Sequence, residues 1–190
     1  MIITELLSRC NIPYYRTPYD QDLHDLCIQE CKLKNYPIDK MIAKHIPCGV
    51  SIASTAYAHL KSRPTQVFIA LYTAFGSWID DTYSQDVLGV DSFNERFVAG
   101  RKQANEYLDG FDRLLHETKL HYHGIQANVI LTSTFNFITS IILDFETKGM
   151  SVSLYWTDGS MVYNKIDVYN LSGFITCQVL HNFFTHLVGR

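Results

Sequence analysis

Proline is confined to one part of this chain, and its distribution limits the possible folds more than any other feature. All 5 prolines lie at or before position 64, and the stretch from Thr65 to Arg190 has none. Glycines occur singly in that stretch. Because proline breaks a helix interior and clustered glycines mark turns, a long apolar segment of this kind is typical of successive α-helices. The prolines are Pro13, Pro18, Pro37, Pro47 and Pro64.

Helix signals start near the N-terminus and recur along the chain. Thr17 followed by Pro18 predicts a helix start with Thr17 as the N-cap. Residues 64–81 carry apolar side chains at close to helical spacing, which predicts a second helix. Residues 125–146 and 171–188 predict two further apolar helices.

Ser92 and Glu95 have the spacing of a capping box, which predicts a helix that continues through Ala104 and Leu108. Strand alternation with turn dipeptides such as Asn-Gly is absent. The sequence therefore predicts an all-α fold in a single domain, residues 1–190.

The composition excludes several classes of protein. Hydrophobic residues make up 47% of the chain and charged residues only 18%, so disorder is not expected. The net charge of −3 provides no basic excess to neutralise phosphates, which argues against a nucleic-acid partner. The start, "MIITELLSRC", lacks the features of a secretory signal, and no window has the apolar length expected of a membrane span. A cytoplasmic location is therefore expected.

The 5 cysteines are an odd number at irregular spacings and do not indicate a disulfide framework. His24, Cys27 and Cys31 could share one helix face, which raises the alternative of a zinc site. A structural zinc site needs a fuller ligand set, and helical cysteines are mostly small core residues. The core interpretation is favoured.

Asp80 and Asp81 end the apolar segment without a neighbouring lysine or arginine. At the C-terminal end of a helix the dipole disfavours each carboxylate by up to about 1 kcal/mol, and the two anions repel each other. A divalent cation reverses these effects, and Mg²⁺ is typically shared between one or two carboxylates and a phosphate. Asp86 is a third candidate ligand if the helix ends near Tyr83. The alternative is a solvated helix end with no ligand.

Three stretches, taken in order, resemble the fungal trichodiene synthase family of terpene cyclases. They are "IALYTAFGSWIDDTYSQD", "FNERFVAGRKQANEYL" and "HYHGIQANVILTSTFNFITSII", and the order and spacing hold over roughly residues 55 to 180. The matching motifs are Asp80-Asp81, Ala99-Gly100-Arg101 and Ser133-Thr134 with Phe137.

The resemblance implies a helical class I terpenoid synthase bundle, incomplete at its C-terminus, that uses Mg²⁺ and farnesyl diphosphate or a related prenyl diphosphate. It implies that Asp80 and Asp81 are catalytic through the metal, and that Arg101 and Lys165 are candidates to contact the diphosphate. For Arg101 the alternative is a surface role. Aromatic side chains that could line an apolar substrate pocket, or simply pack in the core, are Phe68, Tyr72, Phe75, Trp78, Phe135 and Phe137.

The sequence also departs from the family. Ser84 stands where an acidic residue is usual, and the stretch around Lys165 lacks the expected arginine. The family's second metal motif has no match, because Asn182 is followed at the required spacing by His186 and Arg190. The alternative function is therefore a shortened, inactive homologue that binds apolar ligands or oligomerises, with a homodimer as the candidate assembly. Prenyl chain elongation is a third interpretation.

Overall fold

The computed structural model describes most of the chain between residues 17 and 167. The described residues are 5, 9–10, 17–38, 40–83, 89–146, 151–157 and 160–167. The predicted helix over 171–188 therefore lies outside the described residues.

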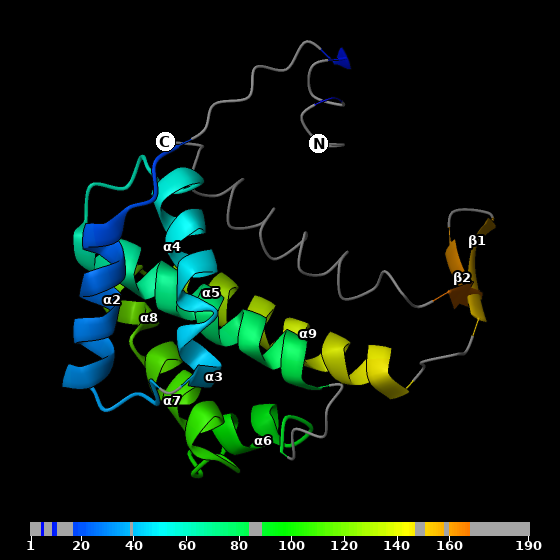
Figure 1. Cartoon of the computed structure of the whole chain (residues 1–190). Helices are drawn as coiled ribbons and strands as arrows, with labels where there is room; N and C mark the ends of the chain where they lie inside the picture. Colours follow the sequence, from blue (N-terminus) through cyan, green and yellow to red (C-terminus); the bar gives the residue numbers. More distant parts are fainter. Residues whose placement is uncertain are drawn as a thin grey trace.

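The described helices form a bundle around α5, as Figure 1 shows. The helices are α2 (Gln21–Leu33), α3 (Lys40–Ala43), α4 (Ile46–Thr55), α5 (Arg63–Tyr83), α6 (Phe93–Val98), α7 (Glu106–His116), α8 (Thr118–His121) and α9 (Ile125–Glu146). The predicted all-α class is confirmed for this bundle. One element was not expected: β1 (Ser151–Thr157) and β2 (Ser160–Asp167) form a two-stranded antiparallel pair.

The long helices were predicted better than the short ones. α5 and α9 match the predicted segments 64–81 and 125–146 closely. The N-cap of α2 is Asp20 and not Thr17, because the Asp20 carboxylate accepts the Leu23 N–H at 2.9 Å.

The single helix predicted after Ser92 is wrong. It divides into α6 and α7, and the chain turns at Gly100, which has a φ of +62°. A left-handed conformation of this kind ends a helix and favours glycine. Ser92 also makes no side-chain capping bond, so the capping box does not form.

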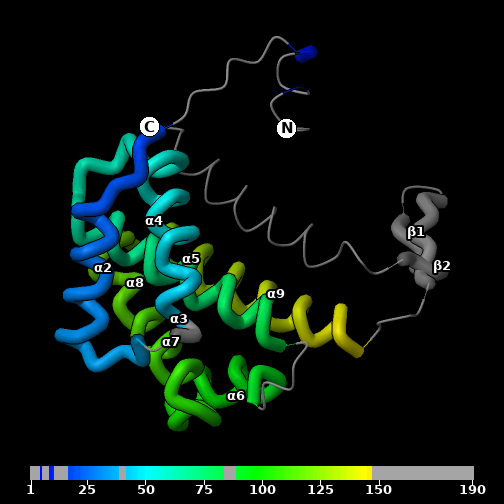
Figure 2. Tube along the Cα trace, in the orientation of Figure 1, coloured from blue at the N-terminus to red at the C-terminus, as the bar shows by residue number. Residues whose placement is uncertain are grey.

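The hydrophobic core lies around α5, which α2, α4 and α7 surround (Figure 2). The Phe75 ring is fully buried and stacks on Phe111 of α7 with 5.8 Å between ring centroids. α4 approaches α5 so closely that a Cβ atom on Gly49 would lie 2.0 Å from the Ala70 carbonyl oxygen. This contact fixes the position of α4 against α5.

Cys27 and Cys31 lie in the core, as the favoured interpretation of the cysteines predicts. Burial raises the pKa of the Cys27 thiol to about 12 and that of Cys31 to about 11. His24 contacts Tyr19, with its Nδ1 atom 2.6 Å from the Tyr19 hydroxyl oxygen.

Among the described residues, α9 is long and apolar enough to cross a membrane by length and composition, with a mean hydropathy of 1.3. This corrects the expectation that no window reaches that length. The helix also contacts its neighbours in the bundle: Asn94 of α6 donates to the Phe135 carbonyl at 3.0 Å. Because core helices of globular proteins meet the same criteria, the finding is weak evidence for a membrane span.

Candidate functional site

The two aspartates lie in the last turn of α5, where the helix leaves the core. Trp78 and Ile79, the residues just before them, are buried, whereas Asp80 and Asp81 are exposed. The described part of α5 extends to Tyr83. Asp86 itself lies outside the described residues. The predicted carboxylate pair is thus presented to solvent at the rim of the bundle.

Asp80 and Asp81 face different neighbours, because successive residues of a helix point about 100° apart. The Asp81 Oδ2 atom lies 3.8 Å from Nδ1 of His45, the residue before α4. Asp80 instead interacts with Asp144 of α9. The two carboxylates therefore face different parts of the bundle, the residue before α4 and the end of α9.

The surroundings of Asp80 disfavour its negative charge. Its pKa is raised, first because neighbouring protein shields the carboxylate from water, and then because the Asp81 and Asp144 carboxylates repel it. A bound cation would remove both sources of repulsion. This electrostatic arrangement is suited to cation binding and costs folding energy without it.

α5 and α9 run side by side in the same direction toward this rim, as Figure 1 shows. The Tyr72 hydroxyl and Thr134 Oγ1 lie 2.9 Å apart, which joins the middle of the two helices. One turn closer to the rim, a Cβ atom on Gly76 would lie 4.0 Å from the Phe137 ring. At the rim itself, the Tyr83 and Phe145 rings meet edge to face at 5.2 Å.

The aromatic candidates occupy different environments. Phe75 and Trp78 are core residues: Phe75 packs between Tyr36 and Phe111, and the Trp78 ring lies 4.9 Å from that of Tyr107. Phe68 and Phe137 are also buried, whereas Tyr72 and Phe135 are half-buried. The face of α5 that carries Tyr72 packs against the face of α9 that carries Phe137. Their predicted contact with substrate remains a prediction.

In the described part of the structure, no side chain predicted to contact the diphosphate lies beside Asp80 and Asp81. The Arg101 guanidinium forms an ion pair with Glu95 of α6, which agrees with the surface alternative. Lys165 lies in β2, and its side chain is outside the described part of the structure. Asn182, His186 and Arg190 also lie outside it.

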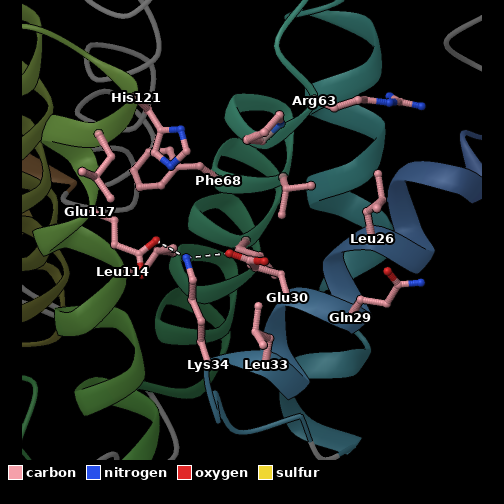
Figure 3. Close-up of a pocket in the computed structure, with 14 residues that line it drawn as sticks. Leu26, Gln29, Glu30, Leu33, Lys34, Arg63, Phe68, Leu114, Glu117 and His121 are labelled. Atoms are coloured by element: carbon pink, nitrogen blue, oxygen red, sulfur yellow. Dashed lines mark hydrogen bonds and ion pairs between the residues drawn. The ribbon is translucent and has the colours of Figure 1, made fainter.

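A groove of about 640 Å³ lies at the opposite end of α5, and Figure 3 shows its lining. Apolar side chains such as Phe68, Leu71 and Leu114 form its floor. Lys34 bridges it, with Nζ 2.5 Å from both Glu30 and Glu117. Of the predicted site residues, only Phe68 lines this groove.

Sequence reasoning missed two neighbours of the aspartates, His45 and Asp144. Each is far from Asp80 and Asp81 in the sequence, and neither belongs to a spaced motif. The available signal was that Asp144, like Glu146, is an acidic residue at the end of the apolar helix α9.

The described residues supply two carboxylates, Asp80 and Asp81, to a candidate Mg²⁺ site. The described part of the chain has no group of three or more His, Cys, Asp or Glu side chains that could hold a metal ion. Two exposed carboxylates nevertheless suit the way Mg²⁺ binds when a substrate phosphate supplies the other oxygens. Asp80 and Asp81 therefore suit a cation whose remaining ligands come from elsewhere.

Comparisons with known proteins identify the relatives of the chain. It is 31% identical to Alpha-cuprenene synthase COP6 from Coprinopsis cinerea over 156 residues, which is 80% of this chain and 48% of that protein. It is 33% identical to Terpene synthase 29 from Postia placenta over 70% of this chain and 39% of that protein. The chain is homologous to fungal terpene synthases.

A third relative of this terpene synthase homologue is Monoterpene synthase 25 from Postia placenta, at 25% identity over 77% of this chain and 44% of that protein. No family model matches the chain. The chain spans less than half the length of each of these three relatives. The predicted resemblance is confirmed at the level of terpene synthases.

Proposed function

We propose that this protein is a terpene synthase of the trichodiene synthase type that converts farnesyl diphosphate into a cyclic product and releases diphosphate. The observation that carries the proposal is the exposed Asp80-Asp81 pair at the end of a buried helix, in a chain 31% identical to Alpha-cuprenene synthase COP6. The chain spans 48% of that relative, so the activity of the whole protein is part of the proposal.

In this proposal Asp80 and Asp81 hold Mg²⁺, and Asp86 is a further ligand. When bound, the metal supplies Lewis acidity that stabilises the negative charge of the departing diphosphate. The raised pKa of Asp80 supports its assignment, since a cation would be stabilised beside a carboxylate that Asp81 and Asp144 repel. The assignment of Asp86 follows from the sequence alone.

The chain's own aromatic side chains have the second role. Loss of diphosphate leaves an allylic cation that water would capture. Aromatic faces stabilise such a cation without adding a nucleophile. Tyr72 and Phe137, where α5 faces α9, are proposed to line this region, and the hydrogen bond between Tyr72 and Thr134 supports a fixed position for the Tyr72 ring. Phe75 and Trp78 would act by holding α5 against the core.

The length of the prenyl chain needs its own test, because one relative is named a monoterpene synthase. A substrate panel separates the cases. The purified chain is incubated with farnesyl or geranyl diphosphate, and the extracts are analysed by gas chromatography with mass spectrometry. Each incubation is repeated after removal of metal with EDTA and after addition of excess Mg²⁺.

We expect a cyclic hydrocarbon or alcohol from farnesyl diphosphate that disappears with EDTA and returns with Mg²⁺. Product from geranyl diphosphate alone would keep the enzyme class and overturn the substrate. No product from either substrate, with helical content verified by circular dichroism, would contradict the proposed activity and favour an inactive homologue.

A further inference from the structure

His45 is a buried polar residue that the sequence motifs do not explain. It stands at the N-cap of α4, yet its side chain makes no capping hydrogen bond to that helix. Only 6% of the residue is exposed. Burying an imidazole without a compensating interaction costs free energy, so its position calls for a partner elsewhere.

The partner that the geometry provides is Asp81. The Nδ1 atom of His45 lies 3.8 Å from Asp81 Oδ2, and in the described part of the structure Nε2 is buried without a hydrogen-bond partner. An imidazole with its proton on Nδ1 directs an N–H toward the carboxylate. The other neutral tautomer would direct a lone pair at an anion, which is unfavourable.

The two side chains differ in freedom of movement. His45 is enclosed by protein, and α4 is fixed against α5 by the contact of Gly49 with Ala70. The Asp81 side chain is 62% exposed and can rotate about its own bonds. Closing the 3.8 Å separation to a hydrogen bond therefore moves Asp81 toward a fixed donor. His45 selects one orientation of that carboxylate.

We propose that His45 is a positioning residue that holds the Asp81 carboxylate in the orientation needed to bind a divalent cation. The inference rests on the proposed function, because it assumes that Asp81 is a metal ligand. Hydrogen bonds to a ligating carboxylate fix its orientation, and loss of such a partner typically costs about 10- to 100-fold in metal affinity. His45 contacts the ligand and not the metal.

The test measures Mn²⁺ binding to the full chain, by the decrease of the electron paramagnetic resonance signal of free Mn²⁺. His45→Phe keeps a planar ring without a donor, and His45→Asn keeps a donor near the position of Nδ1. We expect His45→Phe to weaken Mn²⁺ binding by about tenfold or more, and His45→Asn to retain most of the affinity. Circular dichroism checks that each variant is folded.

A double-mutant cycle separates positioning from general damage to the fold. Asp81→Asn should weaken Mn²⁺ binding, and adding His45→Phe to it should cause no further loss. If His45→Phe does not fold, His45→Leu replaces it in the same cycle. Full affinity in the donor-free variant, or additive losses in the double variant, would overturn the role of His45. Absence of Mn²⁺ binding by the unmodified chain would instead overturn the metal site of the proposed function.

Discussion

Replacing Asp81 by asparagine is expected to lower terpene formation by more than about a hundredfold, because loss of even an outer partner of a metal ligand commonly costs 10- to 100-fold. Asp80→Asn should have a comparable effect. Neither change should unfold the protein. Both carboxylates are exposed at the C-terminal end of α5, where the helix dipole disfavours negative charge.

The stability of these variants distinguishes loss of a ligand from loss of the fold. Asp80→Asn removes a carboxylate that Asp81 and Asp144 repel, so the melting temperature should equal or exceed that of the unmodified protein. Asp22→Asn is the matched control, because Asp22 is an exposed acid near Arg63, at the other end of α5. Unchanged turnover in Asp81→Asn, or an equal loss in Asp22→Asn, would contradict the assigned site.

Gly49→Ala should have the largest effect on stability. The added Cβ atom would lie 2.0 Å from the Ala70 carbonyl oxygen, and a backbone atom in the middle of α5 cannot move aside as a flexible side chain can. Overpacking of this kind costs about 2–3 kcal/mol, which corresponds to a decrease in melting temperature of roughly 4–12 °C for a chain of this size. Thermal unfolding followed by circular dichroism measures it.

Gly76→Ala is the matched control for Gly49→Ala. It makes the same chemical change in a helix, but the added Cβ atom would lie 4.0 Å from the Phe137 side chain, an ordinary contact distance. Alanine favours the helix over glycine by about 1 kcal/mol, so this variant should be at least as stable as the unmodified protein. Equal stability of the two variants would contradict the claim that α4 packs too closely against α5 to leave room for a Cβ atom at Gly49.

The sequence predicted the helices that carry long, uninterrupted apolar patterns. α5 and α9 extend over many turns without a proline, so their helical period is evident. The break between α6 and α7 was missed because it depends on the backbone conformation of Gly100, which a period cannot reveal. The strand pair β1–β2 was also missed, although Asp158-Gly159, a common hairpin dipeptide, separates the two segments in the sequence.

The sequence alone singles out the candidate carboxylate pair but not its neighbours. Asp80 and Asp81 are adjacent and end an apolar run, so their sequence context alone marks them as unusual. His45 and Asp144 reach them only because α4 and α9 pack beside α5. Contacts between distant segments depend on helix packing, and no local spacing encodes them. The structure thus adds the neighbours that orient and perturb the predicted pair.

The central claim is that Asp80 and Asp81 form a working site for Mg²⁺ and diphosphate, and a binding measurement tests it independently of turnover. Inorganic diphosphate is titrated by calorimetry into the unmodified chain and into the Asp80→Ala/Asp81→Ala variant, each with and without Mg²⁺. We predict binding that requires Mg²⁺ in the unmodified chain and is lost in the variant. Equal binding by the two proteins, or binding that does not depend on Mg²⁺, would contradict the claim.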